Sequence, residues 1–87
     1  MTTKTVTVRY FAAIREALGT GSERVSTAAP TLAALRDQLI ARGGAHAEAL
    51  ARGKAVRLAL DQVMAPDESA PLPDGAEVAF FPPVTGG

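Results

Sequence analysis

Residues 77–87 read EVAFFPPVTGG, and they join an alternating segment to a segment with no core pattern. Val78 and Phe80 point to one side of an extended chain, which predicts a last strand over residues 76–81 with these two side chains in the core. Pro82-Pro83 ends this strand, because proline has no N–H to donate to a sheet ladder. The body of the protein is therefore expected to end where these prolines begin.

The length of the chain allows one domain. With 87 residues, 47% of them hydrophobic and 21% charged, it has the composition of an ordinary globular protein with one thin core. No linker or internal repeat divides the sequence. We expect a folded domain over residues 1–81 and an extended, flexible C-terminal tail over residues 82–87.

A second alternating segment lies near the start of the chain. Val6, Val8 and Tyr10 share one side of residues 5–11, so this segment is expected to be a strand with those side chains inward and Phe11 on the opposite face. Because the first and last strands are both apolar, they suit a parallel pair at the centre of a sheet.

The elements between these two strands follow from periodicity and turn residues. They are expected at residues 12–18 (short helix, closed at Gly19), 23–26 (strand), 31–43 (main helix, N-cap Thr31, apolar stripe Leu32, Leu35, Leu39 and Ile40), 45–52 (a further helical turn or two), 54–61 (strand), 63–64 (short strand) and 66–75 (loop). This order favours an α+β fold of the β-grasp kind, a mixed sheet of four to five strands packed on one main helix.

Charge and residue inventory exclude several classes of function. Nine basic residues balance nine acidic ones without a basic stripe, which disfavours nucleic-acid binding. No apolar run approaches the roughly 20 residues that cross a membrane, and no signal peptide opens the chain, so a cytoplasmic location is expected. The absence of cysteine excludes thiolate chemistry, and with His46 as the single histidine no metal site or self-contained enzyme is expected.

The terminal pair Gly86-Gly87 carries the chemistry. Two residues without Cβ atoms form a backbone thin enough to thread a narrow channel, and the Gly87 carboxylate then meets a partner without a side chain in the way. The preceding tail residues, Pro82, Pro83, Val84 and Thr85, let this end reach about 20 Å into another protein. The alternative is a frayed terminus without function.

Phe11 and Phe81 are the candidate docking residues. If the first and last strands are parallel neighbours, both rings lie on the outer face at the root of the tail, and Met64 is placed with them. The alternative is that the rings fold over a sheet edge into a small cluster of their own. Arg9 and Arg57 share this face and are expected to be solvated, although either could meet an acidic partner group.

Residues 77–87 resemble the closing run of the molybdopterin synthase small subunit, a family of ubiquitin-like sulfur carriers. Tyr10-Phe11-Ala12, Arg15-Glu16 and the helix start around Pro30-Thr31 also match that family. The resemblance covers nearly the whole chain. Asp61-Gln62 departs from it, since many relatives carry Asn-Gln at this turn.

The resemblance implies a cycle in which the chain binds no permanent cofactor. An activating enzyme uses ATP to adenylate Gly87, and a sulfurtransferase system converts the acyl-adenylate to a thiocarboxylate. The tail then enters the large synthase subunit, where the sulfur attacks cyclic pyranopterin monophosphate to build the dithiolene of molybdopterin. Catalytic acids and bases are expected in the large subunit, in a heterotetramer of two small and two large chains.

Other functions stay open on the residues alone. The chain could be a protein modifier joined through Gly87 to lysines, a carrier for the thiazole of thiamine or a cysteine precursor, or an interaction module with an inert tail. The C-terminal run favours the molybdopterin pathway.

Overall fold

The computed structural model describes residues 3–51, 53, 55–65 and 67–82. Its strands and helices are, in chain order, β1 (Lys4–Tyr10), α1 (Ala12–Leu18), β2 (Ser22–Thr27), α2 (Leu32–Ile40), α3 (Gly44–Ala49), β3 (Arg57–Leu60), β4 (Val63–Met64) and β5 (Glu77–Phe81). All elements expected from the sequence are present; α1 and β4 have the predicted bounds, and the other elements have shifted ends.

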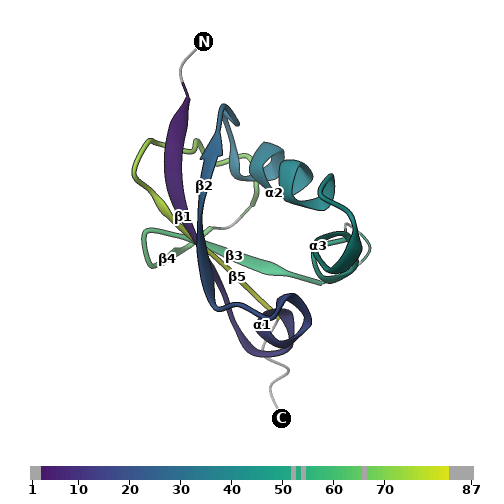
Figure 1. Ribbon diagram of the computed structural model, residues 1–87. Coiled ribbons are helices and arrows are strands. Elements are labelled where there is room, and N and C mark those ends of the chain that lie inside the picture. The colour runs from purple at the N-terminus through teal and green to yellow at the C-terminus, as the bar shows by residue number, and fades with distance from the viewer. Residues whose placement is uncertain (1–2, 52, 54, 66, 83–87) are drawn as a thin grey trace.

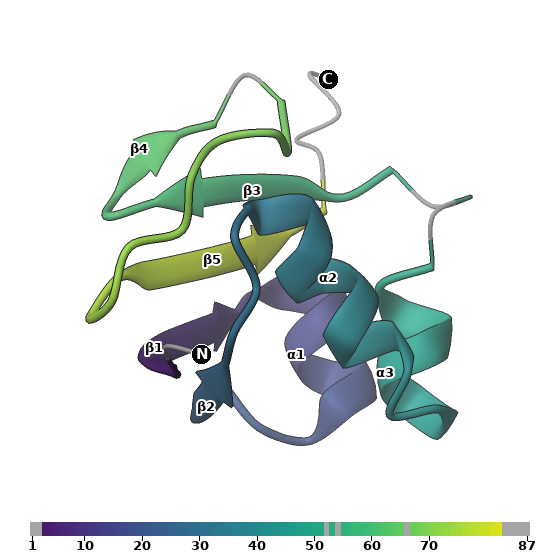
Figure 2. The same cartoon turned by 90° about the horizontal axis from the view of Figure 1, so that it is seen from above.

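The strands form one mixed sheet in the order β2-β1-β5-β3-β4. β1 runs parallel to β5, and the other neighbouring strands are antiparallel, so the predicted parallel pair at the sheet centre is confirmed. Figures 1 and 2 show the longer helix α2 lying across the sheet, with α1 and α3 gathered near the end of β5. This is the ubiquitin-like β-grasp fold.

The core lies between the sheet and α2. Val6, Val8 and Tyr10 from β1 and Val78 and Phe80 from β5 are at most 1% exposed, as their alternation predicted. The leucines of the main-helix stripe are fully buried as well. Two further core residues lie outside the regular elements and were not marked by any alternation or helical stripe: Leu50 directly follows α3, and Leu72 lies in the loop before β5.

The main helix begins as predicted and ends early. The Thr31 side chain accepts a hydrogen bond from the Ala34 N–H at 3.2 Å, which satisfies one of the free donors of the first turn. The helix ends at Ile40, before the predicted stop at residue 43. Gly43, with φ 75°, redirects the chain into α3.

β3 is shorter than the strand predicted over residues 54–61. Asp61 and Gln62 have φ of 49° and 69°, so they form a two-residue turn between β3 and β4. The Asp61 carboxylate Oδ1 accepts the Glu77 N–H at 2.9 Å, and the Asp61 N–H donates to the Glu77 carbonyl at 2.8 Å. These two bonds fix the hairpin to the start of β5.

Phe11 lies just beyond β1, where the prediction placed it inside the strand. Its backbone stays extended, and its N–H donates to the Phe80 carbonyl at 3.1 Å, so it continues the contact with β5. Ala12 then adopts φ 52°, and the Phe11 carbonyl accepts the N–H groups of Ile14 and Arg15. The chain thus changes from strand to helix within one residue, which keeps Phe11 at the level of the sheet.

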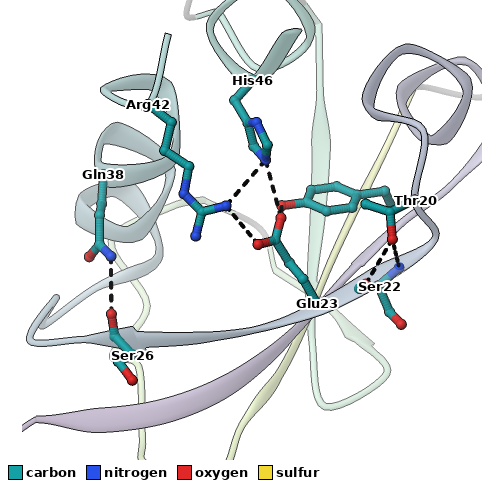
Figure 3. Close-up of polar contacts among 8 residues, drawn as sticks. Thr20, Ser22, Glu23, Ser26, Gln38, Arg42 and His46 are labelled. Carbon is teal, nitrogen blue, oxygen red and sulfur yellow. Dashed lines mark hydrogen bonds and ion pairs between the residues drawn. The ribbon is translucent and has the colours of Figure 1, made fainter. Parts of the chain in front are cut away.

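A polar cluster joins β2 to α3 at the sheet edge (Figure 3). Glu23 accepts hydrogen bonds from Tyr10 Oη at 2.8 Å and Arg42 at 2.6 Å, and His46 Nε2 lies 3.1 Å from its Oε2. The sequence predicts His46 as an exposed helix residue, and this is wrong, because its side chain is only 21% exposed and packs edge-on against the Tyr10 ring.

The cluster alters the titration of Glu23. Burial acts to raise its pKa, but hydrogen bonds from Arg42, His46 and Tyr10 outweigh burial and lower the pKa to about 2 from 4.5. Because the folded-state pKa lies below the unfolded value, the ionised carboxylate stabilises the fold fully above about pH 5, and this contribution is lost as the pH falls toward 2.

Glu23→Gln is expected to lower the free energy of unfolding at pH 7 by on the order of 1 kcal/mol, since solvent screens a partly exposed group. It should also flatten the fall in stability between pH 5 and pH 2. Urea unfolding at pH 7, 5 and 3 measures both effects. Glu48→Gln makes the same change on an exposed carboxylate of α3 and serves as the control. Equal pH profiles for wild type and Glu23→Gln would contradict the assignment.

Candidate functional site

The strand register arranges the outer face of the sheet in rows. Arg9 pairs with Ala79, Ala79 with Ala59, and Ala59 with Met64, which forms one row across four strands. In the next row toward the end of β5, Phe81 pairs with Arg57. Side chains of one face in neighbouring rows are close enough to form a continuous surface.

An open groove of about 570 Å³ lies on this face. Its floor is made of the small side chains of Ala59 and Ala79, and Ala59 is only 8% exposed although it does not belong to the core cluster. The full lining is Arg9, Phe11, Ala59, Gln62, Met64, Glu77, Ala79 and Phe81. The structure therefore brings together the three residues that the sequence singled out for docking, Phe11, Met64 and Phe81.

The two aromatic rings meet directly. Phe11 and Phe81 are 6.4 Å apart between ring centroids, at an interplanar angle of 86°, the edge-to-face arrangement that aromatic pairs prefer. The Arg9 guanidinium carbon lies 5.6 Å from the centre of the Phe11 ring, within the range of a cation–π contact. Phe11 is 40% exposed and Met64 51% exposed, so this apolar surface faces outward.

The groove lies beside the point where the described chain ends. Pro82 follows Phe81, is half-buried, and lines a small apolar cavity of about 170 Å³ with side chains of α1 and α3. The other tail residues singled out from the sequence, Pro83, Val84, Thr85, Gly86 and Gly87, lie outside the described residues.

Within residues 3–82, gaps aside, no group of three or more histidine, cysteine, aspartate or glutamate side chains is placed to hold a metal ion. None of the helices described is long and apolar enough to cross a membrane.

Comparison with known proteins connects this fold to a family. A family model described as ThiS matches residues 8–87, which includes the groove and the two terminal glycines. This chain belongs to the ThiS family.

Two relatives of this ThiS-family chain are both named molybdopterin synthase sulfur carrier subunit. The molybdopterin synthase sulfur carrier subunit of Escherichia coli (strain K12) is 43% identical over 82 residues, which cover 94% of this chain and 99% of that protein. The resemblance seen in residues 77–87 is therefore confirmed.

Solved structures share the fold of this ThiS-family chain. The Haloferax volcanii HVO 2177 protein has a TM-score of 0.78 at 27% identity, covering 98% of this chain and 88% of that one. A chain in the protein–protein complex of subunits 1 and 2 of molybdopterin-converting factor from Helicobacter pylori 26695 has a TM-score of 0.64 at 30% identity, covering 95% and 99%.

Sequence reasoning missed part of the groove. Gln62 was assigned only to a turn, yet its left-handed backbone places its side chain in the lining. The floor residues Ala59 and Ala79 were not singled out from the sequence. The signal that could have found them is the pairing of two small residues at matching positions of neighbouring strands, since a shallow floor needs short side chains.

Proposed function

We propose that this chain is the sulfur carrier subunit of a molybdopterin synthase. The observation that carries the proposal is the 43% identity to a protein of that name over nearly the whole length of both chains. The β-grasp body supports it, because residues of the last strand line an exposed aromatic groove and the sequence after this strand closes with Gly86-Gly87. The chain itself acts as a co-substrate, and catalytic acids and bases belong to the large subunit.

The proposed chemistry takes place at the Gly87 carboxylate. A carboxylate oxygen attacks the α-phosphate of ATP, pyrophosphate leaves, and an acyl-adenylate forms on an activating enzyme. A sulfur nucleophile supplied as a persulfide by a sulfurtransferase then attacks the acyl carbon and expels AMP, and a thiol reductant releases the thiocarboxylate. This sulfur forms a C–S bond to cyclic pyranopterin monophosphate while a C–O bond of that substrate breaks and its oxygen leaves. Water then cleaves the resulting thioester, which frees the sulfur on the product and regenerates the Gly87 carboxylate. Because the cycle consumes ATP, we place it in the cytoplasm.

The groove is the docking surface in this proposal. Phe11, Phe81 and Met64 offer an apolar contact, and aromatic side chains in a desolvated centre dominate the energetics of many interfaces. The large subunit is the partner that receives the tail. The Helicobacter pylori structure is a complex of subunits 1 and 2 of molybdopterin-converting factor. Docking beside the root of the tail directs the terminal glycines into the partner.

Mass spectrometry of the intact protein tests the function. After incubation with ATP, an activating enzyme and a sulfur donor, the carrier is expected to gain the mass of one oxygen replaced by sulfur, on the C-terminal peptide. Omitting ATP should prevent the gain. An isopeptide adduct to lysines would instead assign a protein modifier, and an unchanged mass would reject both functions.

A further inference from the structure

The charges on the outer sheet face are unevenly distributed. Asp61 and Glu77 place two carboxylates in one row at the start of β5, away from the tail, because the Asp61 N–H donates to the Glu77 carbonyl. Arg24 lies in that same row, since both Arg24 and Glu77 pair with Thr7. Positive and negative charges therefore offset one another at this end of the sheet.

The two rows nearer the tail each contain an arginine, Arg9 or Arg57, and no aspartate or glutamate of a neighbouring strand. Arg57 is exposed and pairs in register with Phe81. Within the described residues no ion pair to Arg57 is found. Arg9 reaches Glu77 only at 3.9 Å and keeps 46% of its side chain exposed. The aromatic pair is thus flanked by guanidinium groups on both sides, in a protein whose formal net charge is zero.

A partner that covers the groove must also meet these charges. A guanidinium that loses water without gaining an acceptor is costly, whereas a carboxylate opposite it forms a charge-assisted, often bidentate, hydrogen bond. Arg57 has no such acceptor within the described chain, so the partner has to supply one. Lysine or arginine on the partner would instead be repelled.

We propose that the surface of the large subunit that covers the groove presents carboxylates to Arg57 and Arg9, on either side of an apolar contact with Phe11 and Phe81. This inference rests on the proposed function and adds the chemistry of the partner. The apolar contact holds the complex together, and the flanking charges steer its formation and fix its orientation. Orientation matters because the tail leaves the body at Pro82, directly beyond this pair of rings.

Association kinetics of the purified full-length carrier and large subunit test the proposal. Arg57→Glu is expected to lower the association rate constant about tenfold at low salt, because it turns attraction into repulsion. At about 0.5 M salt the difference should shrink, since screening shortens the range of exposed charges. Arg9→Gln is expected to act in the same direction more weakly. Phe11→Ala should instead mainly raise the dissociation rate.

Arg24→Glu is the matched control. It makes the same charge change on an exposed residue of the same face, in the row away from the tail, and is expected to change the association rate less than about twofold. If Arg57→Glu and Arg24→Glu slowed association equally, the effect would come from net charge alone, and the proposal would be overturned. Unchanged association of Arg57→Glu would also overturn it. Failure of the wild-type carrier to bind the large subunit would overturn the proposed function itself.

Discussion

Deletion of Gly87 is expected to abolish sulfur transfer and leave the fold intact. The acyl carbon of the shortened chain would lie about 3.5 Å short of the position at which the activating enzyme holds ATP. Because a misplacement of 1 Å can lower a rate about a hundredfold, the loss should exceed about a thousandfold. Molybdopterin formation by purified activating enzyme, sulfur donor, carrier and large subunit measures it.

Folding provides the control for this deletion. Among the residues that the structure describes, the core cluster ends at Phe80, so the unfolding midpoint in urea should be the same with and without Gly87. Gly87→Ala keeps the length of the chain and adds one methyl group, and it is expected to lose less activity than the deletion. A shortened carrier that still supports molybdopterin formation would refute the role of Gly87.

Much of the fold could be predicted from the sequence because its centre follows simple periodicity. Val6, Val8 and Tyr10 alternate with polar neighbours, as Val78 and Phe80 do, and strands buried on a single face require that alternation. Leu50 and Leu72 could not be predicted as core residues. Leu50 directly follows α3 and Leu72 lies in the loop before β5, so the burial of each depends on how the chain folds back and not on a local repeat.

The candidate site was predicted to the extent that strand adjacency determines it. Phe11 and Phe81 follow from the parallel pairing of the first and last strands, which brings both rings to one end of the sheet. Gln62 was missed because its direction depends on a left-handed turn conformation. The contacts of His46 were missed because its partner Glu23 lies 23 positions away in the sequence.

The burial of Arg36 also depends on partners distant in the sequence, and its contacts contribute more to stability. It belongs to α2 among buried leucines, and arginine is seldom fully buried, so composition alone places it at the surface. Its side chain is instead 4% exposed. Nε donates to the Leu50 carbonyl and one terminal nitrogen to the Ala51 carbonyl, both at 2.8 Å, while the other terminal nitrogen lies 2.7 Å from Glu68 Oε2. One guanidinium thereby ties α2 to the end of α3 and to the loop before β5.

Replacement of Arg36 by methionine is therefore expected to cost about 3–5 kcal/mol of unfolding free energy. Methionine keeps much of the volume but donates no hydrogen bond, so the buried Leu50 carbonyl, the partly buried Ala51 carbonyl and Glu68 lose their shared partner. Glu68→Gln, which keeps an acceptor for Arg36, should cost only about 1 kcal/mol. Urea unfolding followed by circular dichroism measures both variants. Since small domains are stable by about 5–15 kcal/mol, a cost below about 1 kcal/mol for the methionine variant would mean that the guanidinium is not a structural link.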